Sequence, residues 1–219
     1  MNGEYILHGA VRSSAAWRAR VALELKGLPY REIRRDLNKG EQNAPDYRAV
    51  NPQMLVPSLV CPNGAVLWQS LAIIDYLDEV HPTPALLPPT PEGRARARAL
   101  AQMIACDIHP INNLRVREHV RALLPGDPGA MVKWQAKWNN AGFDAIEAIL
   151  AGSPDLGAFS FGDRPGYVEC FLVPQVGNAK SAGRSMEPYP VIARIADACA
   201  ELGPFQRAAS GLAAADHSR

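Results

Sequence analysis

The sequence predicts an α/β domain followed by an all-helical domain. Short apolar stretches alternate with helical patterns early in the chain, giving the order strand–helix–strand and then strand–strand–helix. A proline-rich segment comes next, and helical periodicity with abundant Ala, Leu, Arg and Glu dominates the rest. We therefore expect an α/β domain over residues 1–82, a linker over 83–93 and a helical domain over 94–219.

Composition and charge limit the class of partner. The chain has 219 residues, of which 47% are hydrophobic, enough to bury a sizeable core. Its formal net charge of +1 gives no overall field to attract nucleic acid or an anionic membrane, so we expect a small-molecule partner. The N-terminus lacks the basic start and apolar core of a signal peptide, which favours a cytoplasmic protein. The cysteines are Cys61, Cys106, Cys170 and Cys199. None forms a CxxC pair, which fits a reducing compartment and predicts no metal site.

The first elements are a strand, a turn and a helix. Residues Tyr5 to His8 have the apolar, branched composition of a strand, and the turn-prone Arg12-Ser13-Ser14 follows them. From Ala15, apolar residues recur every four positions until Lys26-Gly27, which predicts an amphipathic helix that ends at the glycine. Ser13 or Ser14 is the expected N-cap.

The following elements complete the first domain. Tyr30 to Asp36 is predicted as a second strand, and Lys39 to Ala49 as a short helix or a loop. Residues 55–60 and 65–68 form a hairpin around the turn Pro62-Asn63-Gly64, and a helix from Ser70 to about Val80 follows. This order, βαβ and then ββα, is that of a thioredoxin-like domain.

The remaining chain is predicted to be helical. Residues 81–93 hold five prolines, too many for a helix or a central strand. Helical patterns then run through residue 151 and again from about Gly166 to Leu202. The last dozen residues are small and polar, and we expect them to be frayed.

The turn after the first strand is the first candidate site. Redox members of the thioredoxin-like fold place a CxxC there, but this turn reads Arg-Ser-Ser-Ala-Ala-Trp, so it cannot exchange disulfides with a thiol of its own. A hydroxyl at a helix N-terminus can instead donate a hydrogen bond to the thiolate of a bound ligand, and the helix dipole also favours that charge. The alternative is that Ser13 and Ser14 only cap the helix.

Two further segments are suited to a peptide-like ligand. Val56-Pro57 lies at a strand start, where a proline, cis or trans, leaves the preceding backbone groups free to pair with such a ligand. Gln69-Ser70 opens the next helix, where backbone N–H groups and a hydroxyl can bind a carboxylate.

Several segments in succession form a recognisable set of motifs. They are Arg12–Leu23, Asn51–Leu59, Gln69–Ile74 and Cys106–Asn113, with a linker-like stretch at Pro82–Pro88 and a late helix at Leu172–Val176. Together they cover nearly the whole chain and resemble the motifs of zeta-class glutathione transferases, the class of maleylacetoacetate and maleylpyruvate isomerases.

The resemblance implies the glutathione transferase fold, glutathione as cofactor and a homodimer. Ser13, Ser14 and Arg12 would be catalytic, with the serines holding or activating the glutathione sulfur. Val56 would pair with the cysteinyl backbone, and Gln69 and Ser70 would bind the γ-glutamyl end. The second domain, in part that of the partner subunit, would add further glutathione contacts through Asp107, His109, Asn112 and Asn113.

The resemblance also implies the substrate contacts and the reaction. Arg12, His109 and Arg115 would meet a small acidic electrophile. The thiolate would add to a conjugated cis double bond, the resulting single bond would rotate, and loss of the thiolate would leave the trans product.

The residues themselves leave alternatives open for the histidine and the arginines. A histidine beside a proline, such as His109, is commonly a core or interface residue. Two Asn and an Arg follow it within seven residues, so the sequence favours a site and a core or interface position equally. Arg12 adjoins the serine turn and is assigned to the site. Arg18 is interpreted as a surface charge or a salt-bridge partner.

Three positions depart from the family pattern. Ala15 stands where Cys or Thr is usual, so that side chain cannot assist the thiolate. Ser181 stands where the family has an arginine for a substrate carboxylate, and Lys180 or Arg184 would have to replace it without the same bidentate geometry. Gly166 replaces the Ser or Thr of a capping box, which costs on the order of a few tenths of a kcal/mol relative to serine.

These observations support one leading hypothesis and two alternatives. The leading hypothesis is a glutathione-dependent cis–trans isomerase of a small acidic diene of the maleylpyruvate or maleylacetoacetate type. The second keeps the thiolate but uses it for conjugation or addition to another electrophile, as the altered arginine pattern suggests. The third is a non-catalytic binding or assembly protein, which the intact glutathione-binding motif disfavours.

Overall fold

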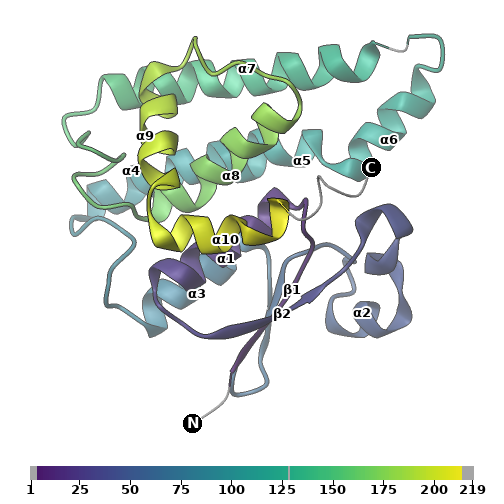
Figure 1. Cartoon of the computed structure of the whole chain (residues 1–219), viewed down its shortest axis with the longest axis horizontal. Coiled ribbons are helices and arrows are strands. Elements are labelled where there is room, and N and C mark those ends of the chain that lie inside the picture. The colour runs from purple at the N-terminus through teal and green to yellow at the C-terminus, as the bar shows by residue number, and fades with distance from the viewer. Residues whose placement is uncertain (1–3, 128, 214–219) are drawn as a thin grey trace. The chain divides into compact units, whose positions relative to one another are not determined.

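The computed structural model describes residues 4–127 and 129–213 (Figure 1). The chain divides into two compact units. The first, here the sheet unit, comprises the chain up to Leu87 together with the segment from Cys199 onward, and the second, the helical unit, comprises Pro88–Ala198.

The sheet unit is built on a four-stranded mixed sheet. The strands are β1 (Tyr5–Gly9), β2 (Tyr30–Arg34), β3 (Ser58–Val60) and β4 (Val66–Trp68), in the order β2-β1-β3-β4. β1 and β2 are parallel, whereas the β1–β3 and β3–β4 pairs are antiparallel. The predicted βαβ-ββα order is therefore confirmed. The predicted third strand is too long, because residues 55–57 lie in a loop that ends at the Val56-Pro57 cis peptide bond.

The first and third helices of the sheet unit begin close to where the sequence predicts them. α1 (Ser14–Leu25) ends before Gly27, whose φ of +65° suits glycine, and α3 (Ser70–Val80) has the predicted bounds. Residues 39–49 were predicted as a short helix or a loop and contain both: two 3₁₀ turns (Leu37–Lys39 and Glu41–Asn43) precede α2 (Pro45–Val50).

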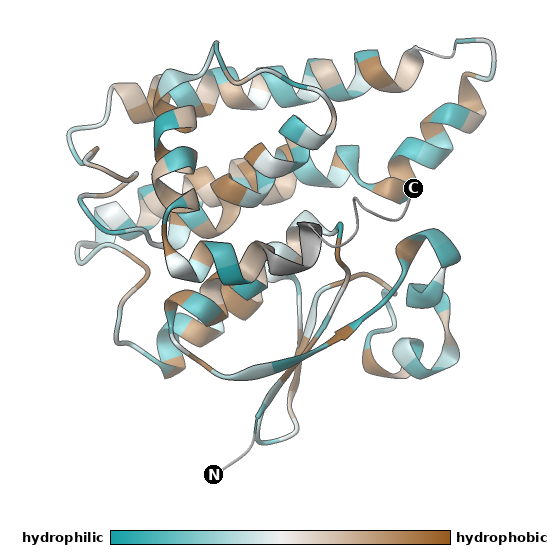
Figure 2. Cartoon of the chain, viewed as in Figure 1, coloured by the Kyte–Doolittle hydropathy of each residue, from teal (hydrophilic) through white to brown (hydrophobic). Residues whose placement is uncertain are grey.

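Seven helical segments form the described part of the helical unit. They are α4 (Pro91–Gln102), η3 (Met103–Ile108), α5 (His109–Asn112), α6 (Leu114–Leu123), α7 (Ala130–Ala151), α8 (Tyr167–Ser181) and α9 (Pro190–Ala200), of which α9 runs past the unit boundary after Ala198. α8 is buried along most of its length, and Figure 2 shows apolar residues concentrated on it. The predicted helical domain is therefore confirmed in its helical character.

A π-helical turn interrupts the helix that runs from α4 into α5. Pro110 has no N–H, so no hydrogen bond can run from this residue back to the carbonyl four residues earlier. The N–H of His109 bonds to Ile104 O, five residues back, as a π turn requires. The segment Met103–Ile108 thus widens just before the proline, and it carries the candidate site residue Asp107.

The last helix corrects the assignment of residues 94–219 to the helical domain. α10 (Gly203–Ala213) packs on α1 and belongs to the sheet unit. The buried Arg20 of α1 donates from Nε to Ala208 O at 2.9 Å, and its Nη1 pairs with Glu32 Oε1 at 2.8 Å. The expected fraying is wrong for residues 208–213, which are helical, and residues 214–219 lie outside the described residues.

A buried ion pair connects α1 and α3 to the segment that follows α3. Lys26 Nζ bonds to Asp78 and also donates to the carbonyls of His81 and Pro84, each at 2.6 Å. Asp78 in turn accepts from Leu86 N at 2.8 Å. This cluster ties α1, α3 and the chain after α3 together.

The start of α8 is capped from one side. Glu169 accepts from Gly166 N at 2.7 Å and from Ser160 N at 2.9 Å. Gly166 has no side chain to accept the reciprocal bond of a capping box, so only the glutamate half of that motif is present.

Among the described residues, no helix is both long and apolar enough to cross a bilayer.

Candidate active site

The sheet register brings three candidate segments to one edge of the sheet unit. His8, near the end of β1, pairs with Ser58, the first residue of β3, and Ser58 pairs with Trp68, the last residue of β4. The segments that follow β1, precede β3 and follow β4 therefore meet at this edge. These segments carry the serine turn, the Val56-Pro57 loop and Gln69-Ser70.

The two serines occupy different positions at the start of α1. Ser13 is half-buried and is the N-cap, because its Oγ accepts a hydrogen bond from Ala16 N at 3.1 Å. Ser14 is the first helical residue and is buried. Arg12 is exposed in the turn before them, and Ala15 is buried in the first turn of the helix. The capping interpretation of Ser13 is thus correct, and its O–H can still donate elsewhere.

The Val56 backbone faces no partner within the sheet. Val56 is half-buried and precedes the cis peptide bond to Pro57. Within residues 4–127 and 129–213, neither its N–H nor its C=O takes part in a backbone hydrogen bond. An extended ligand could therefore pair with both groups, as an added strand pairs with a sheet edge.

The start of α3 combines a strained residue with a buried hydroxyl. Gln69 has φ +68°, which is unusual for a residue other than glycine, and its Nε2 donates to Gln53 Oε1 at 2.8 Å. Ser70 is buried and accepts from Arg18 Nη1 at 3.4 Å. Its backbone lies at a helix N-terminus, which favours a bound carboxylate.

Arg18 is buried, which its sequence context does not predict. The surface-charge interpretation is wrong, because the side chain is 1% exposed and contacts the Ser70 hydroxyl, whereas the salt-bridge interpretation stays a prediction. Helical spacing places Arg18 one turn after Ser14, which was the only available signal, and spacing alone does not reveal that an arginine is buried.

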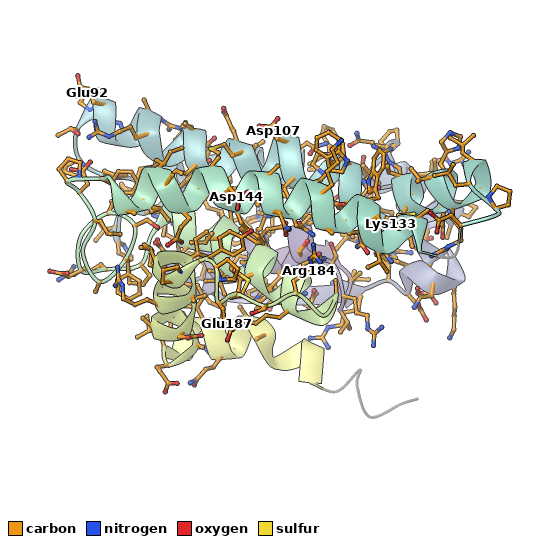
Figure 3. All side chains as sticks on the ribbon, turned by 90° about the horizontal axis from the view of Figure 1, so that it is seen from above. Glu92, Asp107, Lys133, Asp144, Arg184 and Glu187 are labelled. Atoms are coloured by element: carbon orange, nitrogen blue, oxygen red, sulfur yellow. The ribbon has the colours of Figure 1, made fainter. Side chains whose placement is uncertain are left out.

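The remaining candidates belong to the helical unit. Asp107 is exposed on η3 (Figure 3), His109 is half-buried at the start of α5, and Arg115 is exposed on α6. Asn112 is buried, and its Nδ2 donates to Ile108 O at 2.9 Å. Asn113 is the N-cap of α6, since its side chain accepts from Val116 N at 3.2 Å.

The end of α8 shows what occupies the place of the missing arginine. Ser181 is exposed at the last helical position. Lys180 pairs with Asp197 at 3.5 Å, whereas Arg184, labelled in Figure 3, donates from Nη2 to the amide oxygen of Asn140 at 3.2 Å. Of the two cations near Ser181, the lysine is thus engaged with a carboxylate and the arginine with a neutral amide.

The geometry supports thiol chemistry only if a bound ligand supplies the thiol. The segments that meet at the sheet edge contain no cysteine, while hydroxyls and backbone N–H groups gather there at two helix N-termini. Such groups bind and stabilise anions. Among the described residues, no cluster of His, Cys, Asp and Glu could hold a metal ion.

Comparison with known proteins identifies the family. Residues 12–80 match the glutathione S-transferase N-terminal domain, and residues 140–198 match the glutathione S-transferase C-terminal domain. The chain is 48% identical to a maleylpyruvate isomerase of Ralstonia sp. over 204 residues, which cover 93% of this chain and 95% of that protein. This chain belongs to the glutathione S-transferase family. The first matched segment contains every candidate site residue of the sheet unit.

Solved structures place the chain within the zeta class. A bacterial maleylpyruvate isomerase, described as a glutathione S-transferase of the zeta class, aligns with a TM-score of 0.90 and 46% identity over 94% of this chain and 97% of that one. A maleylacetoacetate isomerase from Anaeromyxobacter dehalogenans, with glutathione bound in its active site, aligns with a TM-score of 0.85 and 40% identity over 95% and 96%. The resemblance of the motifs to this class and the glutathione transferase fold are both confirmed.

Proposed function

We propose that this zeta-class glutathione S-transferase is a glutathione-dependent cis–trans isomerase of a small acidic diene of the maleylpyruvate or maleylacetoacetate type. Its relatives named for these two reactions align over nearly their whole length, and one related structure holds glutathione in its active site. The observation that carries the proposal is the sheet edge, where two helix N-termini, their hydroxyls and the unpaired Val56 backbone converge.

The residues of the sheet unit fit glutathione by chemistry. Val56 N–H and C=O would pair with the cysteinyl backbone, and Gln69 with Ser70 would bind the charged γ-glutamyl end. Ser13 and Ser14 would donate hydrogen bonds to the sulfur, which together with the α1 dipole would lower the pKa of the thiol.

The residues of the helical unit are proposed to complete the site. Asp107, His109, Asn112 and Asn113 would provide further glutathione contacts, in part from a partner subunit. We accordingly infer a homodimer from the motif resemblance, and a cytoplasmic location from the N-terminal sequence and the unpaired cysteine pattern.

Catalysis would depend on stabilising negative charge on the substrate. Bound glutathione supplies a thiolate that adds to the conjugated double bond and leaves again after rotation, so that no thiol is consumed. Arg12, which is exposed beside the serine turn, would attract the acidic substrate and neutralise charge that moves toward its carbonyl. His109 and Arg115 are proposed to bind the other acidic end.

An absorbance assay tests this proposal. Purified protein with glutathione should bleach the absorbance of maleylpyruvate or maleylacetoacetate, and should leave the concentration of free thiol unchanged. A rate equal to that of glutathione without protein, on both substrates, would reject the isomerase assignment.

A second function is favoured by the end of α8. Ser181 stands where the family pattern has an arginine, and the neighbouring Lys180 is paired with Asp197. The groups at this position therefore differ from those expected of an isomerase. The same thiolate could then be transferred to another electrophile. Loss of one equivalent of thiol for each product formed would distinguish conjugation from isomerisation.

A further inference from the structure

The carbonyl oxygen of Leu55 accepts hydrogen bonds from two buried side chains. Tyr47 Oη of α2 donates to it at 2.6 Å, and Asn51 Nδ2, at the C-cap of the same helix, donates at 2.7 Å. Tyr47 is 0% exposed and Asn51 is 3% exposed. Two side chains of α2 and its C-cap thus fix one carbonyl of the loop that precedes the Val56-Pro57 bond.

Fixing this carbonyl fixes the direction of the Val56 N–H. Leu55 C=O and Val56 N–H belong to the same peptide unit, which is planar and resists rotation about its C–N bond. In a trans unit the two groups point in opposite directions. Because two donors hold the Leu55 oxygen toward α2, the Val56 N–H points away from α2 and has no backbone partner among the described residues.

The Tyr47 ring is itself held on several sides. The His8 ring of β1 lies with its centroid 5.4 Å from that of Tyr47, and the Arg35 guanidinium lies 4.8 Å from the ring centroid. The Tyr47 hydroxyl also shares a hydrogen bond of 2.8 Å with Ser58 Oγ, the β3 residue that pairs with His8. The hydroxyl therefore links α2, β3 and the loop, and its position does not depend on the ligand.

We propose that Tyr47 and Asn51 are positioning residues that aim the Val56 N–H at the cysteinyl part of glutathione. The inference rests on the proposed function, because it requires Val56 to pair with that ligand. It goes further in assigning the affinity for glutathione partly to two side chains that cannot touch it. A ligand-binding N–H that is oriented in advance loses less conformational freedom on binding.

The test is Tyr47→Phe, which removes the hydroxyl and keeps the ring against His8 and Arg35. We expect the Kd for glutathione, measured by calorimetry, to rise roughly three- to tenfold, as for the loss of one hydrogen bond. The value of kcat at saturating glutathione should stay unchanged, because the groups at the sulfur are intact. Asn51→Ala is the second variant and should weaken binding in the same way.

Tyr5→Phe is the matched control. It removes another buried phenolic hydroxyl of the sheet unit, this one on β1, which bonds to His81 Nε2 at 2.9 Å and not to the loop. Whatever stability the control loses in urea, it should keep the parental Kd for glutathione. In ¹⁵N-labelled protein, the Val56 amide resonance should shift on adding glutathione, and shift less in Tyr47→Phe than in Tyr5→Phe.

Failure of this inference can be told apart from failure of the proposed function. If the unaltered chain does not bind glutathione, the proposed function is wrong and this inference falls with it. If the unaltered chain binds glutathione and both Tyr47→Phe and Asn51→Ala keep its Kd, only the positioning role is wrong. A rise in Kd that Tyr5→Phe reproduces would likewise reduce Tyr47 to a structural residue.

Discussion

At the scale of single residues, the observed cap by Ser13 is compatible with its proposed hydrogen bond to sulfur. Its Oγ accepts from Ala16 N and so caps α1, which is a structural role. A hydroxyl has two lone pairs and one proton, so the same oxygen can accept from the backbone and donate to a thiolate. The cap also fixes where that proton can point. A structural role for Ser13 therefore does not argue against a catalytic one.

Substitution of Ser13 by alanine and by glycine separates these two uses. Ser13→Ala should cost about 1 kcal/mol of stability through loss of the cap, whereas Ser13→Gly should cost only a few tenths, because glycine is a tolerable N-cap. Both variants lack the hydroxyl, so both should raise the pKa of the bound glutathione thiol alike. Thiolate absorbance titrations and urea unfolding measure the two effects. A thiol pKa that changes in Ser13→Ala and not in Ser13→Gly would show that only the cap matters.

The residues that could be predicted were those next to recognisable turns and helix starts. Ser13, Ser14 and Ser70 could be proposed because hydroxyls at helix N-termini have a clear physical use. Tyr47 and Arg18 could not, because their roles depend on burial against segments distant in sequence. Local sequence does not encode such contacts.

At the scale of elements, helix positions were predictable and local irregularities were not. The bounds of α3 follow from its apolar spacing and from the hairpin before it. The π turn at Met103–Ile108 was not predicted, since a proline signals that a helix is disturbed but not how the chain adapts. The length of β3 was overestimated, because residues 55–57 have the apolar composition of a strand and yet lie in the loop before it.

Packing of the π turn on α7 accounts for a glycine in the middle of that long helix. A Cβ added to Gly142 would lie 2.2 Å from Ile108 Cδ1 and 2.4 Å from its Cγ1, and Ile108 is buried. Without this clash, alanine would stabilise a helix interior by about 1 kcal/mol relative to glycine. The close contact should reverse that sign.

We therefore expect Gly142→Ala to lower the free energy of unfolding by about 1–3 kcal/mol through overpacking. Adding Ile108→Ala should remove the clash, so that Gly142→Ala in that background becomes neutral or stabilising. Urea unfolding of the four proteins in this double-mutant cycle measures the coupling. Equal effects of Gly142→Ala in both backgrounds would contradict the packing explanation.

At the scale of the whole molecule, the chain order does not match the order of the compact units. α10 follows the helical unit in sequence and yet completes the sheet unit, where Arg20 holds the Ala208 carbonyl. The predicted helical pattern ended at Leu202, before α10, and even a recognised helical periodicity cannot show which surface covers an apolar helix face. The assignment of residues 94–219 to one domain failed for this reason.

The Lys26–Asp78 pair shows how strongly a charge contact depends on where the fold puts it. The Lys26 side chain is 0% exposed and that of Asp78 is 11% exposed, so removing one charge leaves the other buried without its partner. The Lys180–Asp197 pair is the natural comparison, because its side chains are 52% and 71% exposed. Solvent screens the second pair and not the first.

Asp78→Asn should consequently destabilise the protein by about 3 kcal/mol or more, since it leaves the Lys26 ammonium with the carbonyls of His81 and Pro84 alone. Asp197→Asn, the same chemical change at an exposed pair, should stay within about 0.5 kcal/mol of the parent. Urea unfolding at low and at high salt measures both, and only the Lys180 pair should respond to salt. Similar losses in the two variants would mean that Lys26 reaches water when Asp78 is neutral, and that the buried cluster does not hold the end of α3 against α1.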